Sequence, residues 1–504
     1  MRSKRRRRIV IRRMWASKTK IHAINVGDDG ISNTEEGLQG PIPNLDVKKG
    51  VEDKDAKANR KETGCRKILF SNFADDFGIS GVQVIVGRAV VPLRRLLWIV
   101  VLLAGMGVMT YQIAERVAYF ASFPSHVSVK LHYVDHLTFP AVAICNFNMF
   151  GYTATENSNL THLLYDIYAN SEAMHVIDFD AYDINATASE EFYISHAHAL
   201  SEMILEPTWK KTSIDRDAFQ TILTDFGVCY AFNTGDDNYG IREVDDTGKT
   251  FGLGMLLDTY HWNYNVGPES GVGFQLMLYP QGDVPLVTDL GFAIAVGEEV
   301  RIGVEVTRIT NLAPPHGTCG EKHLSYYQRY SKNACRMECK THFMVRSCGC
   351  KLFYMPGNAT VCNLKESHIC GQKALDAFVN AQSLYPHRGT VVNASSSCDC
   401  PDPCSRVIYK PNLSHAKFPS DAYAEFLQYI IGLPLSYLSD NIAKVDIFFQ
   451  ELSINEVEQQ KAYDIFGLLC DIGGALGLWL GGSVLTVMEI IDICFKGCCS
   501  RTWH

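Results

Sequence analysis

The stretch from Asp471 to Asp492 constrains the fold more than any other part of the 504-residue chain. No charged residue lies between Ile472 and Met488, and the six residues before Asp471 are also uncharged. At about 1.5 Å per residue, a helix of this length crosses the ~30 Å hydrocarbon core of a bilayer. The stretch therefore predicts a membrane helix with carboxylates at both ends, where an ordinary anchor would carry neutral or basic residues.

The acidic ends have a geometric explanation if this helix is continuous. At 3.6 residues per turn, its two ends lie about five turns apart and project from the same side. The residues on that side form a predicted pore lining: Asp471, Ala475, Leu478, Gly482 and Glu489. Small residues recur every fourth position, at Gly473, Gly477 and Gly481, a pattern that lets membrane helices approach closely. Two interpretations remain: a pore surrounded by several copies, and an anchor that dimerises through its glycines.

A second uncharged run, from Leu96 to Ala114, predicts another spanning helix at 93–115. Basic residues precede it at Arg94 and Arg95, and a further cluster occupies the first thirteen residues: Arg2, Lys4, Arg5, Arg6, Arg7, Arg8, Arg12 and Arg13. Under the positive-inside rule, both termini are then cytoplasmic and residues 116–462 are extracellular. The sequence therefore predicts a multi-pass plasma-membrane protein.

The cytoplasmic parts follow from this topology. Residues 1–67 form a basic, flexible tail, 68–92 a pre-helix segment, 463–491 the second membrane helix, and 492–504 the returning tail. Beside a membrane helix the basic cluster favours anionic lipids as its partner, and no nucleic-acid partner is predicted. Three cysteines near the second helix are candidates for palmitoylation or have no role: Cys494, Cys498 and Cys499.

Cysteine usage tests the topology independently. Twelve of the 17 cysteines lie between the two predicted helices, and an even number in an extracellular region favours disulfides. Zinc binding at Cys348-Gly-Cys350 or Cys398-Asp-Cys400 is the alternative, but an oxidising compartment consumes the thiolates that zinc needs. The same region holds all the Asn-X-Ser/Thr glycosylation motifs assigned here: Asn159, Asn185, Asn358, Asn393 and Asn412.

The region between the helices reads as mixed α and β structure. Strands are predicted at 139–144, 274–279, 300–309 and 445–449, and helices at 321–334, 372–382 and 420–431. The sequence shows no phosphate-binding glycine loop, metalloprotease helix or nucleophile elbow. We therefore predict a protein that is not an enzyme and that needs no cofactor or metal.

Several ordered motifs between residues 68 and 492 resemble one family. They are Leu137-Thr-Phe-Pro-Ala-Val-Ala-Ile-Cys145-Asn, Pro314-Pro-His-Gly-Thr-Cys319, Ala334-Cys-Arg-Met-Glu-Cys339, Cys348-Gly-Cys350, Cys398-Asp-Cys-Pro-Asp-Pro-Cys404 and Glu458-Gln-Gln-Lys-Ala-Tyr-Asp464. Together they resemble the degenerin and epithelial sodium channel family, most closely its acid-sensing ion channels. The resemblance implies an α+β membrane protein in which two transmembrane helices flank a disulfide-rich extracellular domain. That domain has a β-sheet palm, a helical thumb at about 313–405 and a finger, and three copies assemble around a pore.

The same resemblance assigns residues to roles. It implies six disulfides: Cys145–Cys229, Cys319–Cys404, Cys335–Cys400, Cys339–Cys398, Cys348–Cys370 and Cys350–Cys362. It places a sodium-selective collar at Gly481, Gly482 and Ser483, because exposed carbonyls and small polar groups replace part of an ion's hydration shell. Carboxylate rings at Glu489 and Asp492 then attract cations at the inner mouth, and Asp471 lies at the outer end. The implied partners are sodium ions and family subunits, in a homotrimer or heterotrimer.

Four departures from the family pattern concern gating. Ser80-Gly81 stands where acid-sensing relatives carry His-Gly, Cys470 replaces a small residue before Asp471, and His316 replaces an aromatic residue in the loop that joins thumb to membrane helix. After Cys319 the acidic cluster is reduced to Glu321. Paired carboxylates sense protons because the contact between two like charges raises the pKa of one of the two carboxyl groups. The loss of acidic residues from this cluster therefore weakens the usual acid sensor.

The sequence leaves several functions open. The predicted function is a voltage-insensitive, amiloride-sensitive sodium channel, gated by protons, by a peptide, or constitutively open. An imidazole at His316 offers another route for acid to reach the pore, or is a surface histidine without effect. An ATP-gated purinergic channel shares the topology but not the cysteine pattern. A non-conducting surface receptor is the remaining class.

Overall fold

The computed structural model describes residues 84–85, 91–156, 159–169, 177–182, 189–235, 240–383, 398–432, 434–483 and 488. The chain divides into two units, residues 1–73 and 74–504, and all described residues belong to the second. The basic cluster, the predicted flexible tail and the membrane-proximal cysteines lie outside the described residues.

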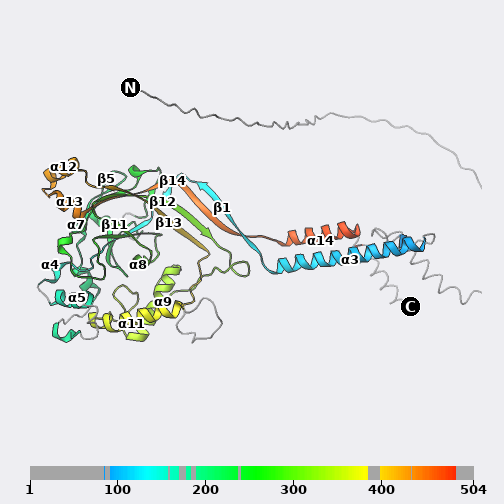
Figure 1. Cartoon of the computed structure of the whole chain (residues 1–504), viewed down its shortest axis with the longest axis horizontal. Helices are drawn as coiled ribbons and strands as arrows, with labels where there is room; N and C mark the ends of the chain where they lie inside the picture. The colour runs from blue at the N-terminus through cyan, green and yellow to red at the C-terminus, as the bar shows by residue number, and fades with distance from the viewer. Residues whose placement is uncertain are drawn as a thin grey trace, which may run out of the picture. The chain divides into compact units, whose positions relative to one another are not determined.

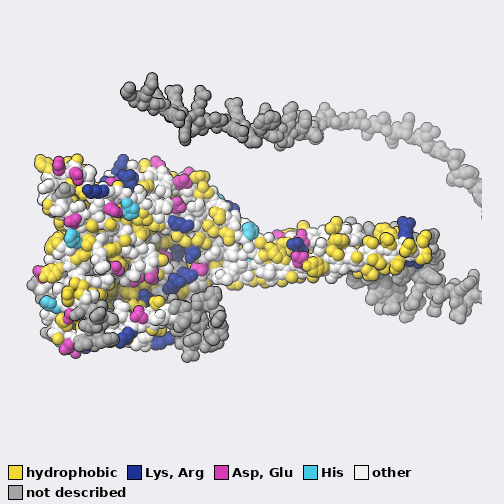
Figure 2. Space-filling view, viewed as in Figure 1, with side chains coloured by type: hydrophobic (Ala, Val, Ile, Leu, Met, Phe, Trp, Pro, Cys, Tyr) yellow, Lys and Arg dark blue, Asp and Glu magenta, His cyan; other side chains and the backbone are white. Residues whose placement is uncertain are grey.

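Helix α3, Pro92–Ala121, begins with a proline in its first turn, where the missing N–H costs no hydrogen bond. Among the described residues it is the helix long and apolar enough to cross a membrane. Its large apolar side chains are exposed along most of its length, and Figure 2 shows hydrophobic side chains covering this part of the molecule with basic side chains at its far end. The helix continues beyond residue 115 to Ala121, and Glu115 and Arg116 are both exposed within it.

Helix α14, Ile465–Leu480, packs antiparallel against α3 (Figure 1). The Asp464 side chain caps it by accepting a hydrogen bond from the Gly467 N–H at 2.7 Å. It ends at Gly481, which takes the left-handed conformation with φ 65°. The prediction of a continuous five-turn helix is therefore wrong, because the backbone leaves the helical path at this glycine.

A seven-stranded mixed sheet, which we call the palm, has the strand order β13-β12-β14-β9-β4-β5, with β1 paired to β14 off this path. Its strands are β1 (Ser125–Tyr133), β4 (Ile204–Trp209), β5 (Thr212–Ser213), β9 (Leu253–Asp258), β12 (Glu298–Thr310), β13 (Ser405–Lys417) and β14 (Ile442–Lys461). The twenty-residue β14 pairs antiparallel with β9 in its first part and with β1 in its last. It therefore runs without interruption from the far end of the palm to α14.

A second sheet has the order β11-β10-β3-β7-β6, and β2 pairs with β8 alone. The strands are β2 (Leu137–Thr138), β3 (Ala141–Asn146), β6 (Phe219–Thr224), β7 (Gly227–Phe232), β8 (Glu243–Val244), β10 (Gly273–Tyr279) and β11 (Phe292–Ala295). Alternate residues of β3 face opposite sides: Val142 and Ile144 join the main core with palm residues such as Val445, and Ala143 joins a smaller cluster with Val287. The main core therefore lies between the two sheets.

The helices lie outside these sheets (Figure 1). They are α4 (Tyr152–Thr155), α5 (Leu160–Tyr168), η2 (Phe179–Tyr182), α6 (Glu190–His196), α7 (Leu200–Met203), η3 (Arg216–Ala218), η4 (Lys249–Phe251), η5 (His261–Asn263), α8 (Val287–Leu290), α9 (Lys332–Cys348), α10 (Leu364–Glu366), η6 (Ser367–Gly371), α11 (Gln372–Ser383), α12 (Asp421–Ile431) and α13 (Leu435–Asn441). We use finger for α5, η2 and α6, and thumb for α9, α10, η6 and α11.

The four predicted strands overlap β3, β10, β12 and β14, and the predictions at 372–382 and 420–431 correspond to α11 and α12. The helix predicted at 321–334 is wrong, because α9 begins only at Lys332 after the Ser331 cap. The preceding loop is held by its tertiary contacts: the backbone N–H groups of Ser325 and Tyr326 donate to the Glu338 carboxylate at 2.8 and 3.0 Å.

Six disulfides have the pairing that the family resemblance implies. Cys145–Cys229 joins the neighbouring strands β3 and β7. Two bridges, Cys335–Cys400 and Cys339–Cys398, tie α9 to the segment before β13, so the thumb is cross-linked to the palm.

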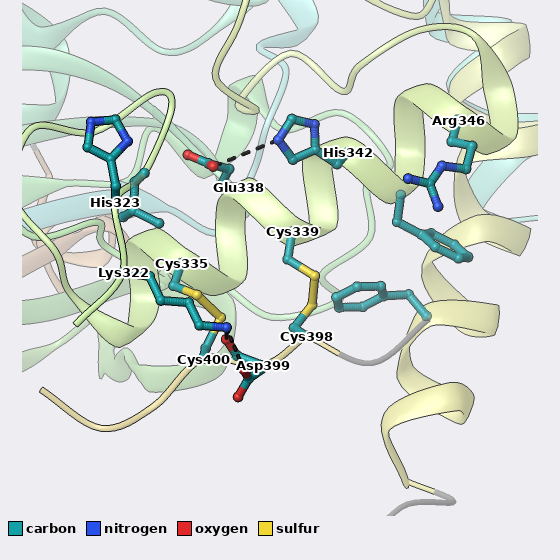
Figure 3. Close-up of a pocket in the computed structure, with 13 residues that line it drawn as sticks. Lys322, His323, Cys335, Glu338, Cys339, His342, Arg346, Cys398, Asp399 and Cys400 are labelled. Carbon is teal, nitrogen blue, oxygen red and sulfur yellow. Dashed lines mark hydrogen bonds and ion pairs between the residues drawn. A yellow bond between two sulfur atoms is a disulfide. The ribbon is translucent and has the colours of Figure 1, made fainter. Parts of the chain in front are cut away.

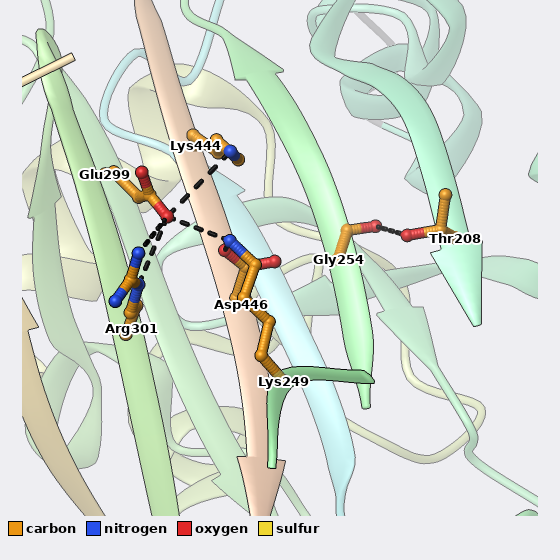
Figure 4. A network of polar contacts seen from close by, with 7 residues as sticks. All are labelled: Thr208, Lys249, Gly254, Glu299, Arg301, Lys444 and Asp446. Atoms are coloured by element: carbon orange, nitrogen blue, oxygen red, sulfur yellow. Dashed lines mark hydrogen bonds and ion pairs between the residues drawn. The ribbon is translucent and has the colours of Figure 1, made fainter. Parts of the chain in front are cut away.

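An ion-pair cluster links three palm elements across the sheet surface (Figure 4). Lys249 of η4 lies 2.9 Å from Glu299 of β12 and 2.6 Å from Asp446 of β14, and Arg301 lies 3.0 Å from the same glutamate. Partial burial opposes ionisation of Glu299, but hydrogen bonds from Lys249 and Arg301 outweigh it and lower its pKa. These contacts fix the register of β12 and β14.

Phe139 is fully buried between the sheets, with ring centroids 4.8 Å from Trp209 and 5.8 Å from Phe449. We expect Phe139→Ala to cost about 3–5 kcal/mol of folding stability, because it removes buried area and leaves a cavity. Thermal unfolding of the detergent-solubilised protein measures this. Tyr429→Ala, at an 89% exposed position, is the control and should leave the midpoint unchanged; an equal effect of both variants would contradict the assignment of Phe139 to the core.

Candidate functional site

The β1–β14 ribbon joins the palm to the two apolar helices, because α3 leads into β1 and β14 leads into α14. Cross-strand pairs hold it: Lys130 lies 3.3 Å from Glu458, and His132 lies 2.8 Å from Glu456. Gln459 adds a bridge to the loop after β12, since its side chain accepts from the Leu312 N–H at 3.0 Å and donates to the Ser125 hydroxyl at 2.9 Å. The palm is therefore connected to both helices through one paired ribbon.

Asp471 lies on α14, where it faces α3 and the incoming strand. The Tyr463 hydroxyl donates to its carboxylate at 2.6 Å, and Arg116 lies 3.7 Å from the same oxygen. The Tyr463 ring also packs edge-on against Tyr119 of α3 at 5.4 Å. The carboxylate of Asp471, predicted at the outer end of the helix, is thus held by one contact from the chain before α14 and one from α3.

The predicted collar lies where α14 ends. The Gly481 N–H donates to Gly477 at 3.1 Å and the Gly482 N–H to Leu476 at 3.3 Å, and Ser483 follows outside the helix. Two residues before Gly481, the Trp479 indole donates to Gln112 of α3 at 2.8 Å. The glycine-serine segment is therefore non-helical backbone anchored immediately beside a helix–helix hydrogen bond.

Close approach of the two helices depends on Gly105 of α3. A methyl group there would lie 3.4 Å from the Trp479 carbonyl oxygen, so a larger side chain would push the helices apart. Cys470, one residue before Asp471, carries an exposed thiol outside any disulfide. The sequence did not single out Gly105, Gln112 or Trp479, because their roles depend on the pairing of the two helices.

His316 lies at the joint between the thumb and α3. Its ring packs edge-on against Phe123, the second residue after α3, with centroids 5.2 Å apart. Its Nδ1 atom is buried and has no hydrogen-bond partner among the described residues. The predicted joint histidine is thus in contact with the chain that enters the membrane helix.

The thumb carries the pocket where the sequence leaves a thinned acidic cluster (Figure 3). This cavity of about 260 Å³ is lined by mixed charges, with Lys322 paired to Asp399 at 2.5 Å and His342 lying 3.8 Å from Glu338. Each carboxylate in these two pairs faces a basic side chain. Within this pocket the structure therefore offers no close pair of carboxylates among its described residues.

Asp258 at the end of β9 is a carboxyl group that sequence reasoning missed. Only 2% of the residue is exposed, and it accepts hydrogen bonds from the Tyr437 hydroxyl of α13 at 3.0 Å and from the Tyr260 N–H at 2.9 Å. Burial raises its pKa to about 6; the nearby Glu202 adds to the rise, and these hydrogen bonds and His261 oppose it. The signal in the sequence that could have identified Asp258 is an acidic residue at the end of the largely apolar run Leu253–Asp258.

The remaining predicted residues are placed as follows. Three glycosylation candidates are exposed: Asn159, Asn358 and Asn412. Six predicted residues lie outside the described part of the chain: Ser80, Gly81, Asn185, Asn393, Glu489 and Asp492. Among the described residues, one group of side chains is spaced closely enough to hold a metal ion: Cys350, Cys362 and Glu366. The two cysteines form a disulfide, however, and therefore offer no thiolate.

Comparison with known proteins places these features in context. Residues 73–493 match the family model for the amiloride-sensitive sodium channel. Acid-sensing ion channel 2 of Homo sapiens is 29% identical over 88% of this chain and 89% of its own length. Acid-sensing ion channel 2 of Danio rerio is 31% identical over 79% and 77%, and acid-sensing ion channel 1 of Gallus gallus 28% identical over 88% and 86%.

Replacing Asp258 tests its titration. A carboxyl with a raised folded-state pKa binds a proton more tightly when folded, so it destabilises the fold as the pH rises from about 4 to about 6. We expect Asp258→Asn to raise stability by about 1–3 kcal/mol at neutral pH and by less at pH ~5. Thermal unfolding at both pH values measures this, with the exposed Asp440→Asn as control; a gain of equal size at both would contradict the raised pKa.

Proposed function

The chain belongs to the amiloride-sensitive sodium channel family, and on that premise we propose that it forms a voltage-insensitive, sodium-selective pore that amiloride blocks. Channels of this family are plasma-membrane proteins assembled from family subunits. For this chain we propose three copies, alone or mixed with other family subunits. Ion conduction, rather than enzyme chemistry, is the activity of the family.

The end of α14 at Gly481 is the observation that carries the proposal. Non-helical backbone at membrane depth is tolerated where it is buried in protein or lines a water-filled path. Here the break exposes backbone carbonyls beside two glycines and Ser483, which is the chemistry that replaces an ion's hydration shell. A simple anchor helix has no need of such a break.

The second membrane crossing rests on the chain around this break. Helix α14 has sixteen residues, roughly 24 Å of helix, which is less than the ~30 Å hydrocarbon core. We propose that the crossing includes the chain beyond the collar up to Glu489 and Asp492, two residues outside the described part of the structure. We assign these two carboxylates to the inner mouth, where rings of negative charge attract cations, and both termini to the cytoplasm.

Whole-cell recording tests the pore. We expect cells that express this chain to carry an inward current that falls when a large organic cation replaces sodium and when amiloride is applied. Gly482→Val should abolish most of the current because three added side chains narrow the collar. Leu97→Phe, an enlargement on the exposed face of α3, is the control. Surface-expressed protein without cation current, or an unaffected Gly482→Val, would refute the proposal.

A specific observation favours acid as the stimulus that activates the channel. The buried Asp258 has a pKa of about 6 and lies where β9, α13 and the start of β14 meet. At about 3.3 Å per residue, the twenty residues of β14 extend about 65 Å from this point to the end of the strand at Lys461, just before α14. Protonation of Asp258 removes a buried charge at one end of a strand whose other end joins the pore helix. A constitutive or peptide-gated channel is the alternative.

Stepping the bath between pH ~8 and ~5 tests this route, because both an imidazole and the Asp258 carboxyl change charge in that range. Asp258→Asn imitates the protonated state, so we expect half-maximal activation to move to higher pH. His316→Trp examines the joint separately, and an unchanged pH response would discard its imidazole as a sensor. An acid-evoked current that is identical in Asp258→Asn and wild type would exclude Asp258.

A further inference from the structure

A hydrogen bond between two apolar helices lies immediately before the predicted collar. The Trp479 indole N–H of α14 donates to the side-chain oxygen of Gln112 of α3 at 2.8 Å. The run from Leu96 to Ala114 carries no charge, and Gln112 is one of its few polar residues. Polar side chains within membrane helices are costly, and they hydrogen-bond across helices or mark functional positions. Gln112 therefore requires an explanation that an apolar anchor does not supply.

The two polar residues before Gln112 do not make this contact. The Thr110 hydroxyl donates to the Met106 carbonyl of its own helix at 2.8 Å, which satisfies it locally. Tyr111 is 70% exposed and lies on the outer face of α3. Of these three consecutive polar residues, Gln112 is the one that hydrogen-bonds to the described part of α14.

Trp479 contacts α3 a second time, through Gly105. A methyl group placed on Gly105 would lie 3.4 Å from the Trp479 carbonyl oxygen and 4.0 Å from the indole ring. Gly105 is buried within α3, so the two backbones approach closely at this point. Gly105 and Gln112 are seven residues apart, which places them on one face of the helix. The backbone and the indole of Trp479 are therefore held against the same face of α3.

These contacts hold the last turn of α14 where the helical path ends. Gly481, two residues after Trp479, takes the left-handed conformation with φ 65°, and its N–H donates to Gly477 at 3.1 Å. Glycines have no side chain, so Gly481 and Gly482 cannot themselves be anchored by side-chain contacts. Among the described residues, Trp479 is the last one before the collar with a hydrogen bond to α3. The position of the collar relative to α3 therefore depends on this residue.

We propose that Gln112 is a positioning residue for the collar and contributes to the selection of sodium over potassium. By accepting the Trp479 hydrogen bond, it sets how the carbonyl groups and Ser483 of the collar face the ion path. The inference rests on the proposed function, because it requires that the collar lines the pore. Without Gln112 the indole N–H has no protein acceptor in an apolar environment, which is costly, so the last turn of α14 shifts and the collar shifts with it.

The permeability ratio of sodium to potassium tests the proposal. It is obtained from the reversal potential of whole-cell currents before and after potassium replaces sodium in the bath. We expect Gln112→Leu to lower the ratio about threefold, the effect of losing one hydrogen bond between membrane helices, with the amount of protein at the cell surface unchanged. Tyr111→Leu removes a polar side chain from the neighbouring exposed position and is the control, so its ratio should equal that of the wild type.

A variant of the donor separates positioning from general damage to the helix pair. Trp479→Phe keeps an aromatic ring but removes the N–H, so the ratio should fall as in Gln112→Leu, and the double variant should fall no further than either. An unchanged ratio in Gln112→Leu, or falls that add in the double variant, would overturn the proposal. If Gln112→Leu does not reach the surface, an unchanged ratio in Trp479→Phe overturns it equally. Wild-type protein at the surface without cation current would instead refute the proposed pore itself.

Discussion

The antiparallel pairing of β1 with β14 is the constraint on which the rest of the structure depends. It joins the strand that follows α3 to the strand that precedes α14, so both helices are attached to one paired ribbon. The ribbon is exposed along much of β1, and its cross-strand contacts include ion pairs such as Lys130–Glu458. Backbone hydrogen bonds and the Gln459 bridge to the loop after β12 must therefore supply most of its rigidity.

The disulfides cross-link the thumb to the palm, from which this ribbon extends. Without them, the thumb would contact the palm mainly through a small apolar cluster around α9 and the loop before β13. The Cys335–Cys400 and Cys339–Cys398 bridges cross-link that contact, and Cys319–Cys404 closes the loop that holds His316. The cross-linked thumb and the loop carrying His316 are thereby attached to the joint at which the His316 ring contacts Phe123.

Sequence periodicity predicted the elements whose burial is one-sided or complete, such as β10 and β12, because alternation and apolar runs report burial directly. It failed at 321–334, where hydrogen bonds from a loop to Glu338 override helical propensity. It also failed at Gly481, since a glycine inside an apolar run gives no sign of whether it packs or breaks a helix. The disulfide pairing came from the family resemblance, because cysteine spacing alone leaves thousands of pairings open. The surroundings of Asp258 depend on residues brought together from distant parts of the chain, which no local pattern encodes.

The carboxyl groups of the thumb pocket and Asp258 differ in the partners that surround them, and therefore in the roles they can have. In the thumb, Glu338 is engaged by two backbone N–H groups and faces His342, and Asp399 is paired with Lys322, so these acids serve structure. Asp258 is different, because its partners are a tyrosine hydroxyl and one backbone N–H, which do not balance the cost of burying a negative charge. Evidence of acid response is therefore better sought at the head of β14 than in the thumb. A proton bound there would change the charge of the core from which β14 starts, and β14 leads by continuous backbone to α14, the helix to which we assign the pore.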